Sequence, residues 1–168
     1  MRAAGVLISI GLALALQTTL ARFVVGGSAA VDLVLVAVVY IALTSGPVSG
    51  MMAGSVAGLI QDALSSGVVG IGGLSKATVG FVVGALGQQF IVTAPLPRLV
   101  IFLGATVGYQ ALFMGIYVLL QQRSFPSPWK AVATQALGNA IVGMIVFSIV
   151  EAFPGAIERR RAGRRSRH

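Results

Sequence analysis

The stretch GPVSGMMAGSVAGLIQD runs from Gly46 to Asp62, and every fourth residue in it is glycine as far as Gly58. Small residues at this spacing let two helices approach closely in a membrane, where lipid supplies no hydrophobic force between helices and dispersion must hold them together. Each step of four residues turns about 40° around a helix with 3.6 residues per turn, so we expect this stripe to meet more than one neighbour. Intramolecular packing is the favoured role, and an oligomer interface is the alternative. The spacing covers Gly46, Gly50, Gly54 and Gly58, and it recurs at Gly80 and Gly84 and at Gly104 and Gly108.

The composition predicts a membrane protein. Of the 168 residues, 57% are hydrophobic and 10% are charged, and the mean hydropathy is +0.94. Ordinary soluble domains carry roughly 25% charged residues, so a bilayer is the expected solvent for this chain. The chain has no cysteine, which excludes disulfides and thiolate metal sites.

Charged residues divide the chain into six predicted spans, because a spanning helix needs about 20 apolar residues. Pro47 splits the long uncharged run 33–61, since proline disfavours a helical predecessor and fits a first turn. The fold class is therefore all-α, a polytopic membrane bundle of about six transmembrane helices. A cleaved signal peptide is the alternative for the first helix, although its uncharged run is longer than the usual apolar core of about 7–15 residues. The predicted helices are 3–21, 31–45, 47–64, 74–91, 98–121 and 130–152.

Asp62 follows the glycine stripe and precedes a glycine-rich segment, 65–73, which we expect to form a loop or a re-entrant segment. Intramembrane carboxylates are costly and usually functional. Three roles stay open for Asp62. It pairs with Lys76 across the segment, it accepts hydrogen bonds from backbone N–H groups of the segment, or it is a proton or substrate site.

The basic residues predict the orientation. Residues 1–155 form the predicted six-helix domain, and 156–168 form a basic tail, expected to be disordered and to lie in the cytoplasm against anionic lipid headgroups. With both termini inside, eight basic residues face the cytoplasm and four face outside. The eight are Arg2, Arg98, Arg159, Arg160, Arg161, Arg164, Arg165 and Arg167, and the four are Arg22, Lys76, Arg123 and Lys130. Nucleic acid is not an expected partner, because no folded basic module accompanies the arginines.

The remaining polar residues predict structural roles. Asp32 is expected to cap the second helix, and Glu151 to form an interfacial ion pair with Arg98 or the tail. Gln17, Gln110, Gln135 and Asn139 lie within predicted spans. Interhelical hydrogen bonds are the favoured role for these four amides, and a substrate pocket is the alternative.

The sequence predicts no enzyme. The single histidine, His168, is the last residue given, and neither a phosphate-binding glycine loop nor a nucleophile elbow is present. No cofactor and no metal site are expected.

These motifs together resemble the MreD family of rod-shape-determining membrane proteins. The resemblance lies in Val31-Asp32-Leu33 to Leu43, Gly46-Pro47, Gly54-x-x-x-Gly58-Leu-Ile-Gln-Asp-Ala-Leu-Ser-Ser-Gly67, and Gly70-x-Gly-Gly-Leu-x-Lys76-x-x-Val79-Gly80-Phe81. Val31 stands where the family often has proline. The candidate structural or partner-interface residues are therefore Gly46, Gly50, Gly54, Gly58, Asp62, Lys76, Gly80 and Gly84.

The resemblance implies a non-enzymatic scaffold of cell-wall elongation in the bacterial inner membrane. Such a protein binds MreC, a single-span membrane protein, and is linked to the actin-like MreB and to the RodA–transpeptidase peptidoglycan synthase. The family is also similar to the substrate-binding components of energy-coupling-factor transporters, which are six-helix bundles. A vitamin-binding subunit, with a pocket from Gln110, Gln135 and Asn139, is thus the alternative, and a small channel or proton-coupled carrier using Asp62 is a third hypothesis.

Overall fold

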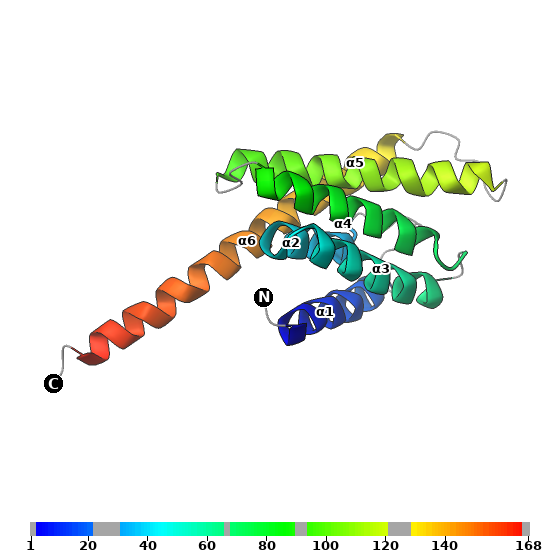
Figure 1. Cartoon of the computed structure of the whole chain (residues 1–168). Helices are drawn as coiled ribbons and strands as arrows, with labels where there is room; N and C mark the ends of the chain where they lie inside the picture. The colour runs from blue at the N-terminus through cyan, green and yellow to red at the C-terminus, as the bar shows by residue number, and fades with distance from the viewer. Residues whose placement is uncertain (1–2, 22–30, 66–67, 90–93, 121–128, 166–168) are drawn as a thin grey trace.

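The computed structural model describes residues 3–21, 31–65, 68–89, 94–120 and 129–165. Within these ranges the chain is all-helical, with six helices and no strand, as predicted. The C-terminal part of α6 extends away from the other helices, which lie alongside one another (Figure 1). The helices are α1 (Ala3–Ala21), α2 (Leu33–Ser45), α3 (Pro47–Leu64), α4 (Ile71–Gln89), α5 (Pro95–Leu119) and α6 (Trp129–Arg165).

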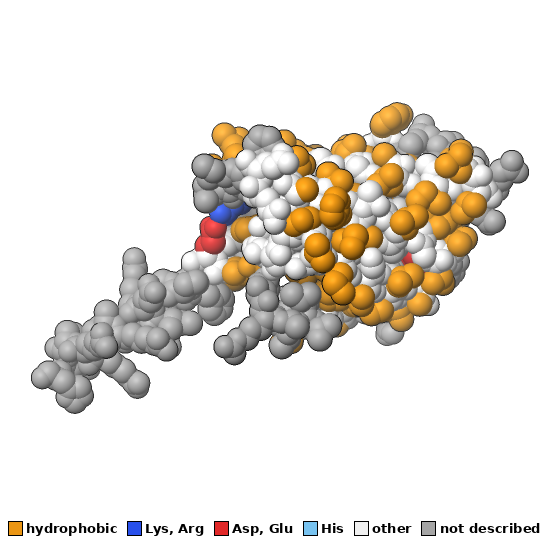
Figure 2. All heavy atoms as spheres, in the orientation of Figure 1, with side chains coloured by type: hydrophobic (Ala, Val, Ile, Leu, Met, Phe, Trp, Pro, Cys, Tyr) orange, Lys and Arg blue, Asp and Glu red, His pale blue; other side chains and the backbone are white. Residues whose placement is uncertain are grey.

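Two segments are long and apolar enough, by length and composition, to cross a membrane: Pro95–Leu119 and Trp129–Glu151. Ile8–Thr19 and Leu33–Ser45 are shorter apolar helices. Each of α3 and α4 carries one charged residue among several glycines and serines, which lowers its hydropathy. Hydrophobic side chains are spread over the visible face of the helices, where few charged ones appear (Figure 2). These features support a membrane protein.

Helix α2 is the centre of the fold. Its sequence, LVLVAVVYIALTS, is apolar on all sides, a pattern that favours burial on all sides. Two apolar clusters meet on it. One joins α2 to α4, α5 and α6 through residues such as Val39, Val83 and Phe102. The other joins it to α1 and α3, with Val38 and Ala57 fully buried.

A single residue, Gly46, connects α2 to α3. Its φ is 89° and its ψ is 177°, a region that glycine adopts without a Cβ penalty. Pro47 then occupies the first turn of α3, where its missing N–H costs no hydrogen bond. The helix break predicted from Gly46-Pro47 is confirmed.

The three largest differences from the predicted helix boundaries concern α4, α5 and α6. Helix α4 begins at Ile71, within the expected loop, and α5 begins at Pro95 and includes Pro97. Both prolines fit because the first turn of a helix leaves its N–H groups unpaired in any case. The predicted ends at Ile91 and Gln121 lie outside the described residues.

The third difference concerns α6, which we expected to end near 152. It continues to Arg165, through most of the segment 156–168 that we expected to be disordered. Seven of the ten residues from Ala156 to Arg165 are alanine or arginine, which favour a helix. Residues 166–168 lie outside the described residues.

Candidate functional site

The glycine stripe packs α3 directly onto α4. A Cβ built at Gly54 would come within 3.0 Å of the Lys76 backbone, and one at Gly58 would lie 2.6 Å from the Cα of Gly73. Such distances are unattainable for a real side chain, so only glycine allows this approach. The stripe therefore packs within one chain, which is the role favoured from the sequence.

The same contacts account for most of the other predicted site residues. A Cβ at Gly50 would meet the carbonyl oxygen of Gly80 at 2.5 Å and also the Cβ of Ala42 on α2 at 2.6 Å, so this glycine meets two neighbours. Gly84 lies against the backbone of Pro47, and Gly46 faces Gln88. The stripe thus fills the α3–α4 interface, and a role of these glycines in partner binding stays a prediction.

Asp62 holds the first turn of α4. Its Oδ2 accepts hydrogen bonds from the backbone N–H groups of Gly70, Gly72 and Gly73, at 2.9, 2.9 and 3.2 Å. The first N–H groups of a helix have no partner within the helix, and a carboxylate also complements the positive end of the helix dipole. This second alternative is what the structure shows. Helix α4 begins at Ile71, three residues before the predicted start, because Asp62 of α3 caps its first turn.

We expect Asp62→Asn to destabilise this turn by about 1 kcal/mol, the typical difference between a charged and a neutral hydrogen bond. Amide hydrogen exchange of the purified protein would be faster at Gly72 and Gly73 than in the unmodified chain, and unchanged in α2. Equal exchange at both glycines would contradict the capping role. A proton-conducting role predicts instead that this variant loses proton flux in liposomes.

Lys76 does not pair with Asp62. Its Nζ lies 2.9 Å from Oδ2 of Asp32, with the two side chains 1% and 4% exposed, and 4.0 Å from the centre of the Tyr109 ring. The other oxygen of Asp32 accepts from Leu35 N at 3.0 Å, which confirms the predicted cap of α2. Sequence reasoning missed the ion pair because it considered Lys76 only as a partner of Asp62 or as a charge on the outer side. The helix periodicity of 74–91, which turns Lys76 inward beside Val79 and Gly80, was the available signal.

Polar side chains from three more helices surround this ion pair. Asn139 of α6 accepts from Asp32 N at 2.7 Å and donates to the Thr106 hydroxyl at 3.1 Å. Gln17 of α1 bridges the start of α2, accepting from Leu33 N at 2.8 Å and donating to Val31 O at 3.2 Å. The amide of Gln110 donates to that of Gln135, linking α5 to α6. The predicted interhelical hydrogen bonds of these amides are thus present.

A second ion pair ties the start of α5 to α6, as predicted. The two guanidinium nitrogens of Arg98 lie 2.9 and 2.5 Å from the carboxylate oxygens of Glu151, in the bidentate geometry that favours arginine over lysine. The guanidinium also lies 4.6 Å from the centre of the Phe147 ring.

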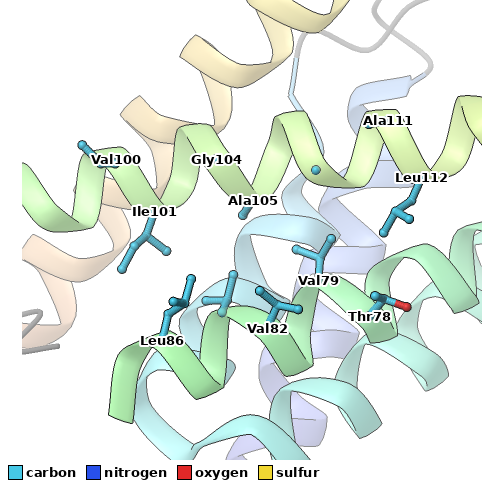
Figure 3. Close-up of a pocket in the computed structure, with 12 residues that line it drawn as sticks. Thr78, Val79, Val82, Leu86, Val100, Ile101, Gly104, Ala105, Ala111 and Leu112 are labelled. Carbon is cyan, nitrogen blue, oxygen red and sulfur yellow. The ribbon is translucent and has the colours of Figure 1, made fainter. Parts of the chain in front are cut away.

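An apolar groove of about 580 Å³ runs between α4 and α5. Val82 and Leu86 of α4 face Ile101 and Leu112 of α5 across it (Figure 3). The groove exists because its α5 wall carries small residues one helical turn apart. A Cβ built at Gly104 would meet no atom within 4 Å. The wall of small residues consists of Gly104, Ala105, Gly108 and Ala111.

The acidic side chains that the structure describes all bind groups within the chain. Asp32, Asp62 and Glu151 each bind a cation or backbone donors. Among the residues that the structure describes, no three His, Cys, Asp or Glu side chains come together to hold a metal ion. The groove between α4 and α5 is lined almost entirely by apolar side chains.

Residues 3–154 match a family model described as rod shape-determining protein MreD. The matched region includes α1 to α5 and α6 up to residue 154. Comparisons with curated proteins and with solved structures give no match.

Proposed function

This chain belongs to the MreD family of rod shape-determining proteins, and from that premise we propose that it is a non-enzymatic scaffold of the cell-wall elongation complex. The family is one of structural membrane proteins that determine cell shape. In the proposed role the chain binds the transmembrane helix of an MreC-like single-span protein and so helps to organise peptidoglycan synthesis by the RodA–transpeptidase synthase, with MreB as a further partner.

We propose that all six helices cross the bacterial inner membrane with both termini in the cytoplasm. Lys76 and Arg98 are buried and paired with acids, so neither counts as a loop charge. Seven basic residues then lie inside, namely Arg2 and the six tail arginines, against Arg22, Arg123 and Lys130 outside. The excess of arginine and lysine on the cytoplasmic side supports this orientation.

The groove between α4 and α5 is the proposed binding site of the partner's transmembrane helix. It is lined by apolar side chains with one hydroxyl, that of Thr78. Helices associate in membranes through close packing against small residues, and Gly104 and Gly108 let a partner's backbone approach α5. The α3–α4 stripe is already filled by contacts within the chain, which leaves the second glycine pair for a partner. This open glycine wall is the observation that carries the proposal.

Filling the groove tests the proposal. We expect Gly104→Leu to reduce recovery of an MreC-like protein at least tenfold in co-purification from native membranes under mild detergent, because the new side chain occupies the partner's place. The fold should survive, since the added side chain enters open space. Gly115→Leu is the matched control. It lies on the same helix, a Cβ there also meets no atom within 4 Å, and it does not line the groove.

Two outcomes would count against this assignment. Equal recovery with the unmodified chain and with Gly104→Leu would remove the groove as the partner site. Failure to recover any single-span protein with the unmodified chain would remove the scaffold role itself.

The vitamin-transport alternative receives less support. Of the three amides expected to form its pocket, Gln110 and Gln135 line a cavity of about 230 Å³, whereas Asn139 is fully buried in hydrogen bonds to Asp32 and Thr106. Mass spectrometry of small molecules retained by the purified protein distinguishes the two functions, because a stoichiometric vitamin supports transport.

A further inference from the structure

A polar cavity lies at the end of the bundle where α1 and α3 end and α2 and α6 begin. Its volume is about 230 Å³, and side chains from four helices and from Asp32, the N-cap of α2, converge on it. This position is distinct from the α4–α5 groove, with which it shares no lining residue. The cavity is lined by Gln17, Asp32, Gln61, Tyr109, Gln110, Phe113, Ala131 and Gln135.

The charges beside the cavity cancel within the protein. Asp32 binds Lys76 through one oxygen and Leu35 N through the other. Because the ammonium and the carboxylate neutralise each other, a charged ligand would enter a low-dielectric site without a counter-ion, which is costly. The cavity therefore favours a neutral ligand.

Gln61 leaves a hydrogen-bond acceptor unused in this wall. Its Oε1 is inaccessible to solvent and accepts no hydrogen bond among the described residues. A buried acceptor without a partner costs stability, and such groups are uncommon in native structures. Rotation of the Gln61 amide would turn this acceptor into the cavity, where a ligand O–H or N–H donor would satisfy it.

The remaining walls combine polar and apolar surfaces. Gln17, Gln110 and Gln135 bring amide groups, which both donate and accept hydrogen bonds. Tyr109 and Phe113 bring aromatic rings whose centres lie 5.6 Å apart. Such a lining suits a compact molecule with hydroxyl groups around its edge and a C–H face toward the rings.

We propose that this cavity binds a neutral hydroxylated ring of about the size of one sugar unit, with Gln61 accepting a hydrogen bond from it. The site goes beyond the scaffold function and does not depend on it, since the partner helix is placed elsewhere. In the proposed orientation the cavity faces the outer side of the membrane, where α1 and α3 end.

The test uses the purified full chain in lipid nanodiscs and three probes that share one ring and differ in charge. They are N-acetylglucosamine, which is neutral, glucosamine, which is cationic, and glucuronate, which is anionic. Ligand-observed NMR and calorimetry should give saturable binding of the neutral probe, at least tenfold tighter than of either charged probe. Absence of saturable binding of the neutral probe, or a preference for a charged one, overturns the proposal.

Two variants assign the binding to this cavity. Gln61→Leu should weaken binding of the neutral probe at least tenfold without lowering the thermal unfolding temperature, because it removes the unused acceptor. Gln89→Leu, at the exposed end of α4, is its control. Ala131→Phe should block the cavity, whereas Ala133→Phe, exposed on the same helix and absent from the lining, should not.

Unchanged binding in both Gln61→Leu and Ala131→Phe would place the ligand elsewhere and overturn the assignment. Recovery of the single-span partner should be the same for Gln61→Leu and the unmodified chain. Failure of this proposal is thereby distinguishable from failure of the scaffold function.

Discussion

Lys76→Met is expected to lower the free energy of unfolding by about 3–5 kcal/mol, the range measured when one partner of a buried ion pair is removed. The variant leaves the Asp32 carboxylate buried without its cation, since that side chain is 4% exposed. It also removes the ammonium that lies 4.0 Å from the centre of the Tyr109 ring. Thermal unfolding in detergent, followed by circular dichroism, measures the change.

A double variant separates the lost pair from the lost packing. Asp32→Asn with Lys76→Met should recover much of the stability, because an asparagine still accepts from Leu35 N and no buried charge is left over. Lys130→Met is the control, since this lysine is exposed at the start of α6. If Lys76→Met were as mild as Lys130→Met, the ion pair would contribute little to the fold.

Gly54→Val should destabilise the fold by about 3 kcal/mol, the upper end of the usual cost of overpacking. The new Cβ would collide with backbone atoms of Lys76 and Ala77, which cannot rotate away as a flexible side chain would. Helix α3 cannot shift aside either, because Gly50 and Gly58 make similar backbone contacts on both sides of Gly54.

Gly115→Val is the matched control for this prediction. It introduces the same β-branched residue in place of glycine in a helix, with the same change in helix propensity, at a position where a Cβ meets no atom within 4 Å. The difference in unfolding free energy between the two variants reports the α3–α4 contact alone. Equal stability of the two variants would contradict the close packing of these helices.

The arrangement of helices in sequence was predictable to a large extent. The charge spacing and Gly46-Pro47 located all six helices. The length of an uncharged run and the helix break at a proline can both be recognised from the local sequence alone. The glycine stripe correctly predicted close helix packing. The sequence did not predict that α4 is the helix packed against the stripe. Glycine spacing marks the contact face of one helix and does not indicate which other helix packs there.

The pairing of charges was harder to predict. Asp62 and Lys76 are close in sequence, and a pair between them was one of the three roles left open for Asp62. In the structure Asp62 instead caps α4, which leaves Lys76 to meet Asp32 on α2. The choice depends on how α2, α3 and α4 are rotated about their axes, and an apolar helix such as α2 carries no polar face that would indicate its rotation.

The pairing of Lys76 with Asp32 has a consequence for how the chain is made. If α4 crosses the membrane as proposed, its lysine entering lipid alone would cost up to about 2.5–3.5 kcal/mol, the insertion-scale value for a lysine at a helix centre. The acid that neutralises it belongs to α2, which leaves the ribosome earlier. Insertion of α4 is therefore favoured once α2 is already in the bilayer. Because α2 is translated first, Asp32 is in place before Lys76 enters the membrane.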